Sequence, residues 1–114
     1  MSEARARNHY LGKEGYQKLN CCQAVLSAFA DKTNILQEEI LEAQGFGGGR
    51  APQGRCGALQ AVHMLLKDSP RRIQEHEAVF QAKAGSLRCQ EIRALRKLSC
   101  VGCVETAARC IEKD

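Results

Sequence analysis

Residues 45–61, GFGGGRAPQGRCGALQA, decide how this chain folds. The first ten of these residues include five glycines and a proline, so the backbone must turn sharply, with several residues at positive φ. A helical apolar pattern starts directly after Cys56, which places this thiol among free backbone N–H groups at the positive end of a helix dipole. Such groups favour the thiolate, the reactive and metal-binding form of cysteine. We therefore predict that Cys56 is the centre of the chain's chemistry.

The composition indicates a single globular domain that spans residues 1–114. Hydrophobic residues make up 44% of the chain and charged residues 26%, which is typical of a folded domain with one modest core. With three Phe, two Tyr and no Trp, the core must consist of aliphatic residues, alanine and cysteine. The net charge of +4 is mild, and no basic stripe with stacking aromatics is visible. This pattern disfavours nucleic-acid binding.

The cysteine count has to be read together with the expected compartment. The first ten residues lack the apolar segment of a secretory peptide, and the longest apolar stretch, residues 58–66, is too short to span a bilayer. We therefore expect a cytoplasmic protein without membrane contact. An odd number of cysteines, seven, in a reducing compartment fits a permanent disulfide framework poorly. Redox exchange, metal binding and simple burial are the alternatives.

The apolar periodicity predicts an all-α fold, a compact bundle of about six to seven short helices with a glycine-rich loop and no strand. Polar caps and the Ser69-Pro70 pair mark most of the helix starts. The expected helices are residues 2–11, residues 21–30 after Asn20, residues 35–44 after Asn34, a fourth from Ala58, residues 70–84 after Ser69, a sixth capped by Ser86 and a seventh capped by Ser99.

Five of the seven cysteines fall in the first turn of a predicted helix: Cys21, Cys22, Cys56, Cys89 and Cys100. This position lowers the pKa of a thiol, which favours thiol chemistry over simple burial. Cys100 and Cys103 form a CxxC pair whose sulfurs lie about 60° apart around a helix axis. No second CxxC follows at zinc-knuckle spacing, and a thioredoxin fold would need strands.

The glycine-rich loop is not a phosphate loop, because no Gly-Lys-Ser/Thr follows it and no strand precedes it. We expect the loop to form the floor of a pocket into which the cysteines point. On this interpretation Gly47, Gly48, Gly49 and Gly57 are the positions that would contact a bound group.

Several motifs, in order, resemble the C_GCAxxG_C_C family of putative redox-active proteins, which are small helical domains. The motifs are NCCQAVL at residues 20–26, GFGGG at residues 45–49 followed by CGAL at residues 56–59, the block that runs from Phe80 to Ile92, and the block that runs from Cys100 to Ala108. The resemblance covers the chain from about Leu19 onward. It implies that Cys21, Cys56, Cys89 and Cys100 are the family cysteines and that Cys22, Cys103 and Cys110 are additional. Ala61 stands where the family motif usually has a second glycine.

The leading functional hypothesis is thiol–disulfide exchange or electron transfer, in which Cys56 reacts and a neighbouring cysteine resolves the product. An alternative is that the same cysteines hold an iron–sulfur cluster or a zinc ion. A third alternative is a partner-binding helical domain without chemistry. The expected partner is a redox protein or a small thiol, and the small core is compatible with a homodimer.

Overall fold

The computed structural model describes residues 2–30, 32–33, 35, 37–47 and 49–112, and within them the chain is all-α, as predicted. Seven α-helices follow one another: α1 (Ser2–Leu11), α2 (Cys21–Ala28), α3 (Gln37–Glu42), α4 (Gly57–Leu65), α5 (Pro70–Ala84), α6 (Cys89–Leu95) and α7 (Cys100–Glu112). Two 3-10 turns, Ala43–Phe46 and Pro52–Gly54, lie in the glycine-rich segment between α3 and α4.

Most predicted helices start where the sequence indicated. Asn20 caps α2. Its side chain accepts a hydrogen bond from the N–H of Gln23 at 2.8 Å, and the Gln23 side chain in turn accepts one from the Asn20 N–H. Ser99 Oγ accepts a hydrogen bond from the N–H of Gly102 at 3.0 Å at the start of α7. Pro70 begins α5, although Ser69 makes no side-chain cap.

The second helix ends at Ala28 rather than at residue 30, the fourth starts at Gly57 rather than at Ala58, and two helices differ more from the prediction. The third helix is shorter than residues 35–44, because the chain tightens into a 3-10 turn at Ala43 before the glycines; its predicted cap, Asn34, lies outside the described residues. The sixth helix does not start at Ser86. Its N-cap is Arg88, and Ser86 Oγ instead accepts a hydrogen bond from the Arg88 N–H at 3.1 Å within the preceding turn.

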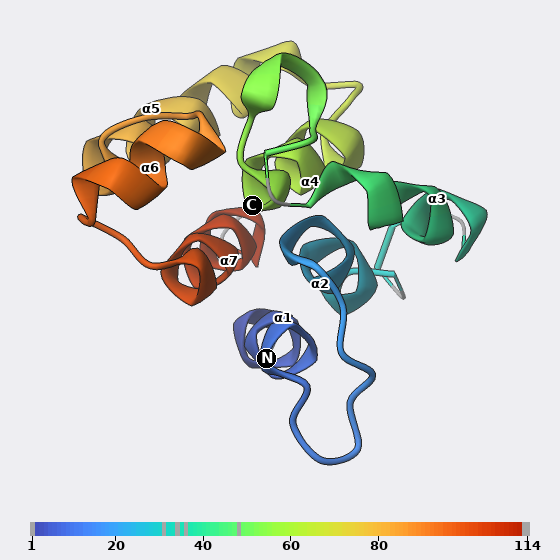
Figure 1. Ribbon diagram of the computed structural model, residues 1–114. Coiled ribbons are helices and arrows are strands. Elements are labelled where there is room, and N and C mark those ends of the chain that lie inside the picture. The colour runs from blue at the N-terminus through green and yellow to red at the C-terminus, as the bar shows by residue number, and fades with distance from the viewer. Residues whose placement is uncertain (1, 31, 34, 36, 48, 113–114) are drawn as a thin grey trace.

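Helix α7 lies at the centre of the bundle and packs against α1, α2, α4 and α5 (Figure 1). Alanine allows this close packing, because its small side chain lets the backbones of two helices approach each other. The buried alanines include Ala24, Ala58, Ala61, Ala107 and Ala108, each no more than 1% exposed. Ala61 is therefore part of the core.

Larger apolar side chains fill the space between these alanines. The largest fully buried ones are Phe80, Leu26, Leu59, Val25, Val62 and Val104. They come from α2, α4, α5 and α7, so the core is shared by helices from the whole length of the chain. None of the described helices has the length and apolar character needed to cross a membrane.

Candidate functional site

The structure confirms that cysteines gather at helix starts. Cys21, Cys89 and Cys100 are the first residues of α2, α6 and α7, and Cys56 is the N-cap of α4. Four helix N-termini from different parts of the chain thus each present a thiol. The question is how the fold brings these ends together.

Glycine allows the first approach, between α2 and α4. A Cβ placed on Gly57 would overlap Cys21 Sγ, and it would lie 3.0 Å from the carbonyl oxygen of Phe46. The Cys21 sulfur therefore packs directly on the backbone of the residue that follows Cys56. Any side chain larger than hydrogen at position 57 would push the two cysteines apart.

The loop before α6 makes the second approach. Arg55 and Arg88 form an isolated antiparallel bridge, and the N–H of Cys56 donates to the carbonyl of Leu87 at 2.9 Å. This pairing places Cys89 next to Cys56. On the other side, the position of a Cβ on Gly49 is 3.5 Å from Cys89 Cβ, so the glycine loop packs against this cysteine.

Helix α7 supplies the remaining thiols. The Cys103 side chain is in hydrogen-bonding contact with Cys56, and this contact is the largest cause of the raised pKa of Cys56. One turn earlier, Cys100 interacts with the side chains of Tyr10 and Arg93. The CxxC pair therefore shares one helix face, as its spacing predicted.

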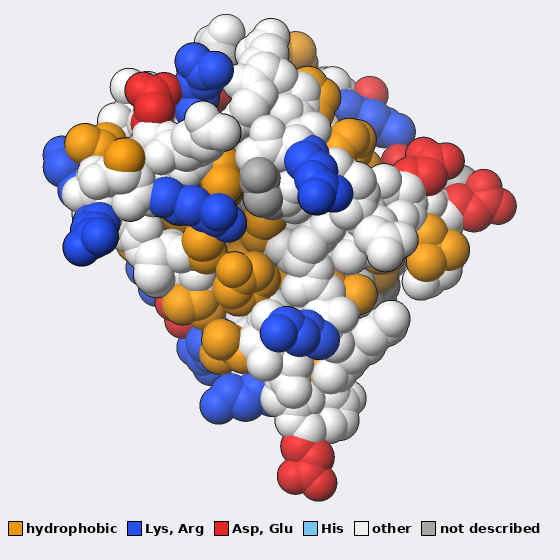
Figure 2. Space-filling view, viewed as in Figure 1, with side chains coloured by type: hydrophobic (Ala, Val, Ile, Leu, Met, Phe, Trp, Pro, Cys, Tyr) orange, Lys and Arg blue, Asp and Glu red, His pale blue; other side chains and the backbone are white. Residues whose placement is uncertain are grey.

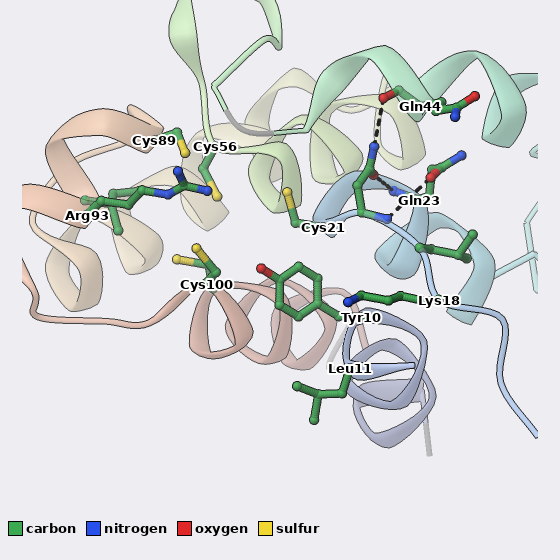
Figure 3. A pocket seen from close by; sticks show the side chains of 14 residues that line it. Tyr10, Leu11, Lys18, Cys21, Gln23, Gln44, Cys56, Cys89, Arg93 and Cys100 are labelled. Atoms are coloured by element: carbon green, nitrogen blue, oxygen red, sulfur yellow. Dashed lines mark hydrogen bonds between the residues drawn. The ribbon is translucent and has the colours of Figure 1, made fainter. Parts of the chain in front are cut away.

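These contacts bring the thiols together, and the thiols line one pocket of about 620 Å³ (Figure 3). Five cysteines take part: Cys21, Cys56, Cys89, Cys100 and Cys103. Cys56 is 5% exposed, Cys89 7% and Cys103 2%, whereas Cys21 and Cys100 are half-buried. All seven cysteines of the chain are in the thiol form.

Cys22 does not line this pocket, although we predicted it as a site residue. Consecutive helical residues point about 100° apart, so when Cys21 faces the pocket, Cys22 faces the core. It is fully buried there, with its sulfur 3.9 Å from the sulfur of Met64. Cys110, on the last turns of α7, also lies outside the pocket.

The thiol pKa values overturn the expectation that helix starts make these cysteines acidic. Burial raises the pKa of Cys21 to about 11, and burial likewise raises the pKa of Cys22 and Cys89. The Cys103 contact and burial hold the pKa of Cys56 well above its usual range, although the backbone N–H groups of Ala58 and Leu59 lower it. Backbone N–H groups at the helix starts lower the pKa of Cys21 and Cys56 as expected, but burial outweighs this effect at Cys21, and the Cys103 contact together with burial outweighs it at Cys56.

Three of the glycines that we predicted to contact a bound group, Gly47, Gly49 and Gly57, pack closely against neighbouring residues. Neither Gly47, Gly49 nor Gly57 lines the pocket, and Gly48 lies outside the described residues. A Cβ on Gly47 would lie 3.0 Å from Cβ of Asn20, whose amide donates to the carbonyls of Ala43 and Gln44 at 3.0 and 3.1 Å. Contact of these glycines with a ligand stays a prediction.

The metal alternative has no support from this arrangement. Zinc and iron–sulfur sites need several ligands around one point. Within the part of the chain that the structure describes, no three His, Cys, Asp or Glu side chains are placed to hold a metal ion.

The other residues that line the pocket were not predicted as site residues, and they include three with ionisable side chains, Tyr10, Lys18 and Arg93. Arg93 follows Cys89 by four residues on α6, so the helical spacing would have placed both on one face. Tyr10 is on α1 and Lys18 in the segment before α2, and nothing in their spacing connects them to the cysteines.

Comparison with known proteins agrees with the cysteine pattern. A family model described as "Putative redox-active protein (C_GCAxxG_C_C)" matches residues 19–113. No curated protein and no solved structure gives a significant match to the chain. The match covers most of the chain and all seven cysteines. The chain therefore belongs to the C_GCAxxG_C_C family of putative redox-active proteins.

Proposed function

We propose that this protein carries out thiol–disulfide exchange in the pocket, with Cys56 as the attacking thiol and Cys103 as the resolving thiol. The observation that carries the proposal is the direct side-chain contact between Cys56 and Cys103 inside a pocket lined by five thiols. A disulfide joins two sulfurs about 2.0 Å apart, so the two side chains have to rotate towards each other for it to form.

Cys56 is the thiol around which the others are arranged. Its charge is among the causes that raise the pKa of Cys21, Cys22 and Cys89, which places it near all three. Backbone N–H groups of Ala58 and Leu59 are directed at its sulfur and stabilise a thiolate there once the proton has left.

The reaction balances as two exchanges. The Cys56 thiolate attacks one sulfur of a disulfide RSSR, which forms a mixed disulfide and releases one RS⁻. The Cys103 thiolate then attacks the Cys56 sulfur, which forms the Cys56–Cys103 disulfide and releases the second RS⁻. The protein loses two electrons and two protons, and RSSR becomes two RSH.

The raised pKa of Cys56 favours the direction in which the protein donates electrons. A thiol of high pKa is a poor leaving group, so the Cys56 sulfur is released slowly when another thiol attacks a disulfide that contains it. The raised pKa of Cys56 also makes the first attack faster as the pH rises, because more thiolate is present.

Thiol counting tests the proposal. Reduced protein is mixed with a small disulfide, quenched in acid, alkylated under denaturing conditions and analysed by mass spectrometry. We expect the chain to lose two of its seven thiols, with a peptide linkage between Cys56 and Cys103. A thiol count that stays at seven, or a linkage that leaves out Cys56, would contradict the proposal.

Two serine variants complete the test. In the time that the unaltered protein needs to lose two thiols, Cys56→Ser should keep all its remaining thiols. Its reaction with the small disulfide should be at least about tenfold slower, because the attacking sulfur is gone. Cys110→Ser is the matched control, since this cysteine lies on the same helix as Cys103 but outside the pocket, and it should react like the unaltered protein.

A further inference from the structure

Two cations reach over the cysteine pocket from opposite sides. Arg93 extends from α6 and its guanidinium points towards the space between the thiols, whereas Lys18, in the segment that precedes α2, extends towards Tyr10 from the opposite side of the pocket (Figure 3). The hydroxyl of Tyr10 points into the same space. These groups line the pocket together with the cysteines, but the exchange reaction itself does not use them.

Among the residues that the structure describes, no carboxylate forms an ion pair with either cation. The pocket lining contains no Asp or Glu, and within the described residues no ion pair joins Lys18 or Arg93 to an acid. The groups that raise the pKa of Arg93 are Cys100, Cys89 and Tyr10. Figure 2 shows the same face, where the acidic side chains lie at the margins of the view and Lys and Arg lie around the apolar centre.

The dimensions of the pocket favour a small molecule over a protein. A volume of about 620 Å³ lies in the range of small-ligand sites. Cys56 and Cys103 are nearly buried, so a disulfide must enter the pocket to reach them. A disulfide on the surface of a folded protein would meet Cys21 and Cys100 first.

From these observations we propose that the pocket selects small disulfides that carry carboxylates, with Lys18 and Arg93 binding the carboxylates while the disulfide lies against Cys56. Charge-assisted hydrogen bonds from a guanidinium and an ammonium are the usual means of holding a carboxylate. The inference depends on the proposed exchange reaction, since it names the class of substrate for that reaction.

Three disulfides with the same two-carbon arms separate charge from size: dithiodipropionate is anionic, hydroxyethyl disulfide neutral and cystamine cationic. The rate with which reduced protein releases the small thiol is measured for each. Each rate is divided by the rate with free dithiothreitol, which reduces all three disulfides, and this removes the intrinsic reactivity of the disulfide. We expect the corrected rate to fall from dithiodipropionate to hydroxyethyl disulfide to cystamine.

The double variant Lys18→Gln/Arg93→Gln removes both cations. We expect about a tenfold loss of rate with dithiodipropionate, which corresponds to about 1.4 kcal/mol, and less than a twofold change with hydroxyethyl disulfide. Both side chains belong to exposed residues, so the variant should fold, and circular dichroism verifies this. Arg93→Lys keeps the charge and should retain most of the preference.

The double variant Lys67→Gln/Arg71→Gln is the matched control. It removes the same charge at exposed positions that do not line the pocket, so it reports general attraction of anions by the positive chain. Equal loss in both double variants, or equal corrected rates for all three disulfides, overturns the inference and leaves the exchange reaction standing. A protein that reacts with none of the three overturns the proposed function as well.

Discussion

Gly57→Ala tests whether glycine is what allows Cys21 to lie beside Cys56. The added methyl would overlap Cys21 Sγ and would lie 3.0 Å from the carbonyl oxygen of Phe46 and 3.2 Å from the N of Cys22. The sulfur would have to leave its place beside Cys56, and the two backbone atoms cannot move without shifting α2 or the glycine loop. We therefore expect a loss of stability rather than the gain that Gly→Ala often brings in a helix.

Two opposing contributions set how much Gly57→Ala changes the free energy of unfolding. Overpacking a close contact costs roughly 1–3 kcal/mol. Replacing glycine by alanine in a helix interior returns up to about 1 kcal/mol, and less at position 57 because it is the first residue of α4. The net expectation is a free energy of unfolding lowered by about 1–2 kcal/mol, or a melting temperature lowered by about 4 °C or more.

Urea unfolding under reducing conditions measures this change, and a double-mutant cycle locates its cause. In a Cys21→Ala background the methyl has no sulfur to displace, so Gly57→Ala should cost about 1 kcal/mol less. Gly45→Ala is the control, because a Cβ there meets nothing within 4 Å, and it should change stability by less than about 0.5 kcal/mol. An identical cost in both backgrounds would refute the reasoning.

Two more predictions follow from the same contacts. The free energy of unfolding should fall as the pH rises above about 9, because burial raises the pKa of Cys21 from 9.0 to about 11 and the folded state therefore keeps a proton that the unfolded chain loses. The Cys21 thiol alone should lower the free energy of unfolding by roughly 2–3 kcal/mol between pH 9 and pH 11. Urea titrations at several pH values measure this fall. In Cys21→Ala the free energy of unfolding should fall less over the same pH range. Asn20→Ala should lower stability by about 2–3 kcal/mol, because it removes both the cap of α2 and the hydrogen bonds to the carbonyls of Ala43 and Gln44. Asn20→Asp keeps the cap acceptor and loses only the amide donor, so a smaller loss in urea unfolding is expected, and equal losses would show that the cap contributes nothing and that the amide hydrogen bonds alone matter.

Much of the site could be predicted because it is encoded locally. Asn20, Ser99 and the proline at position 70 mark helix starts through hydrogen bonds and backbone geometry within a few residues. The cysteines that follow such starts were therefore found from their position in the chain. The CxxC spacing likewise predicted that Cys100 and Cys103 share a face, and both line the pocket.

Other features depend on residues far apart in the chain. The choice between Cys21 and Cys22 rests on how α2 turns towards the core, and the sequence places both at the same helix start. Lys18 and Tyr10 reach the pocket only because α1 packs against α2 and α7. No local pattern around either residue reports this packing.

The sequence by itself determined the all-α class, the glycine-rich turn and the set of thiols at helix starts, since each depends on interactions between near neighbours. Only the tertiary structure decided the acidity of those thiols. The backbone N–H groups at a helix start lower a thiol pKa, and they can be located from the sequence. The burial that raises the pKa depends on which other helices cover the sulfur, and at Cys21, Cys56 and Cys89 burial and neighbouring thiols have the larger effect.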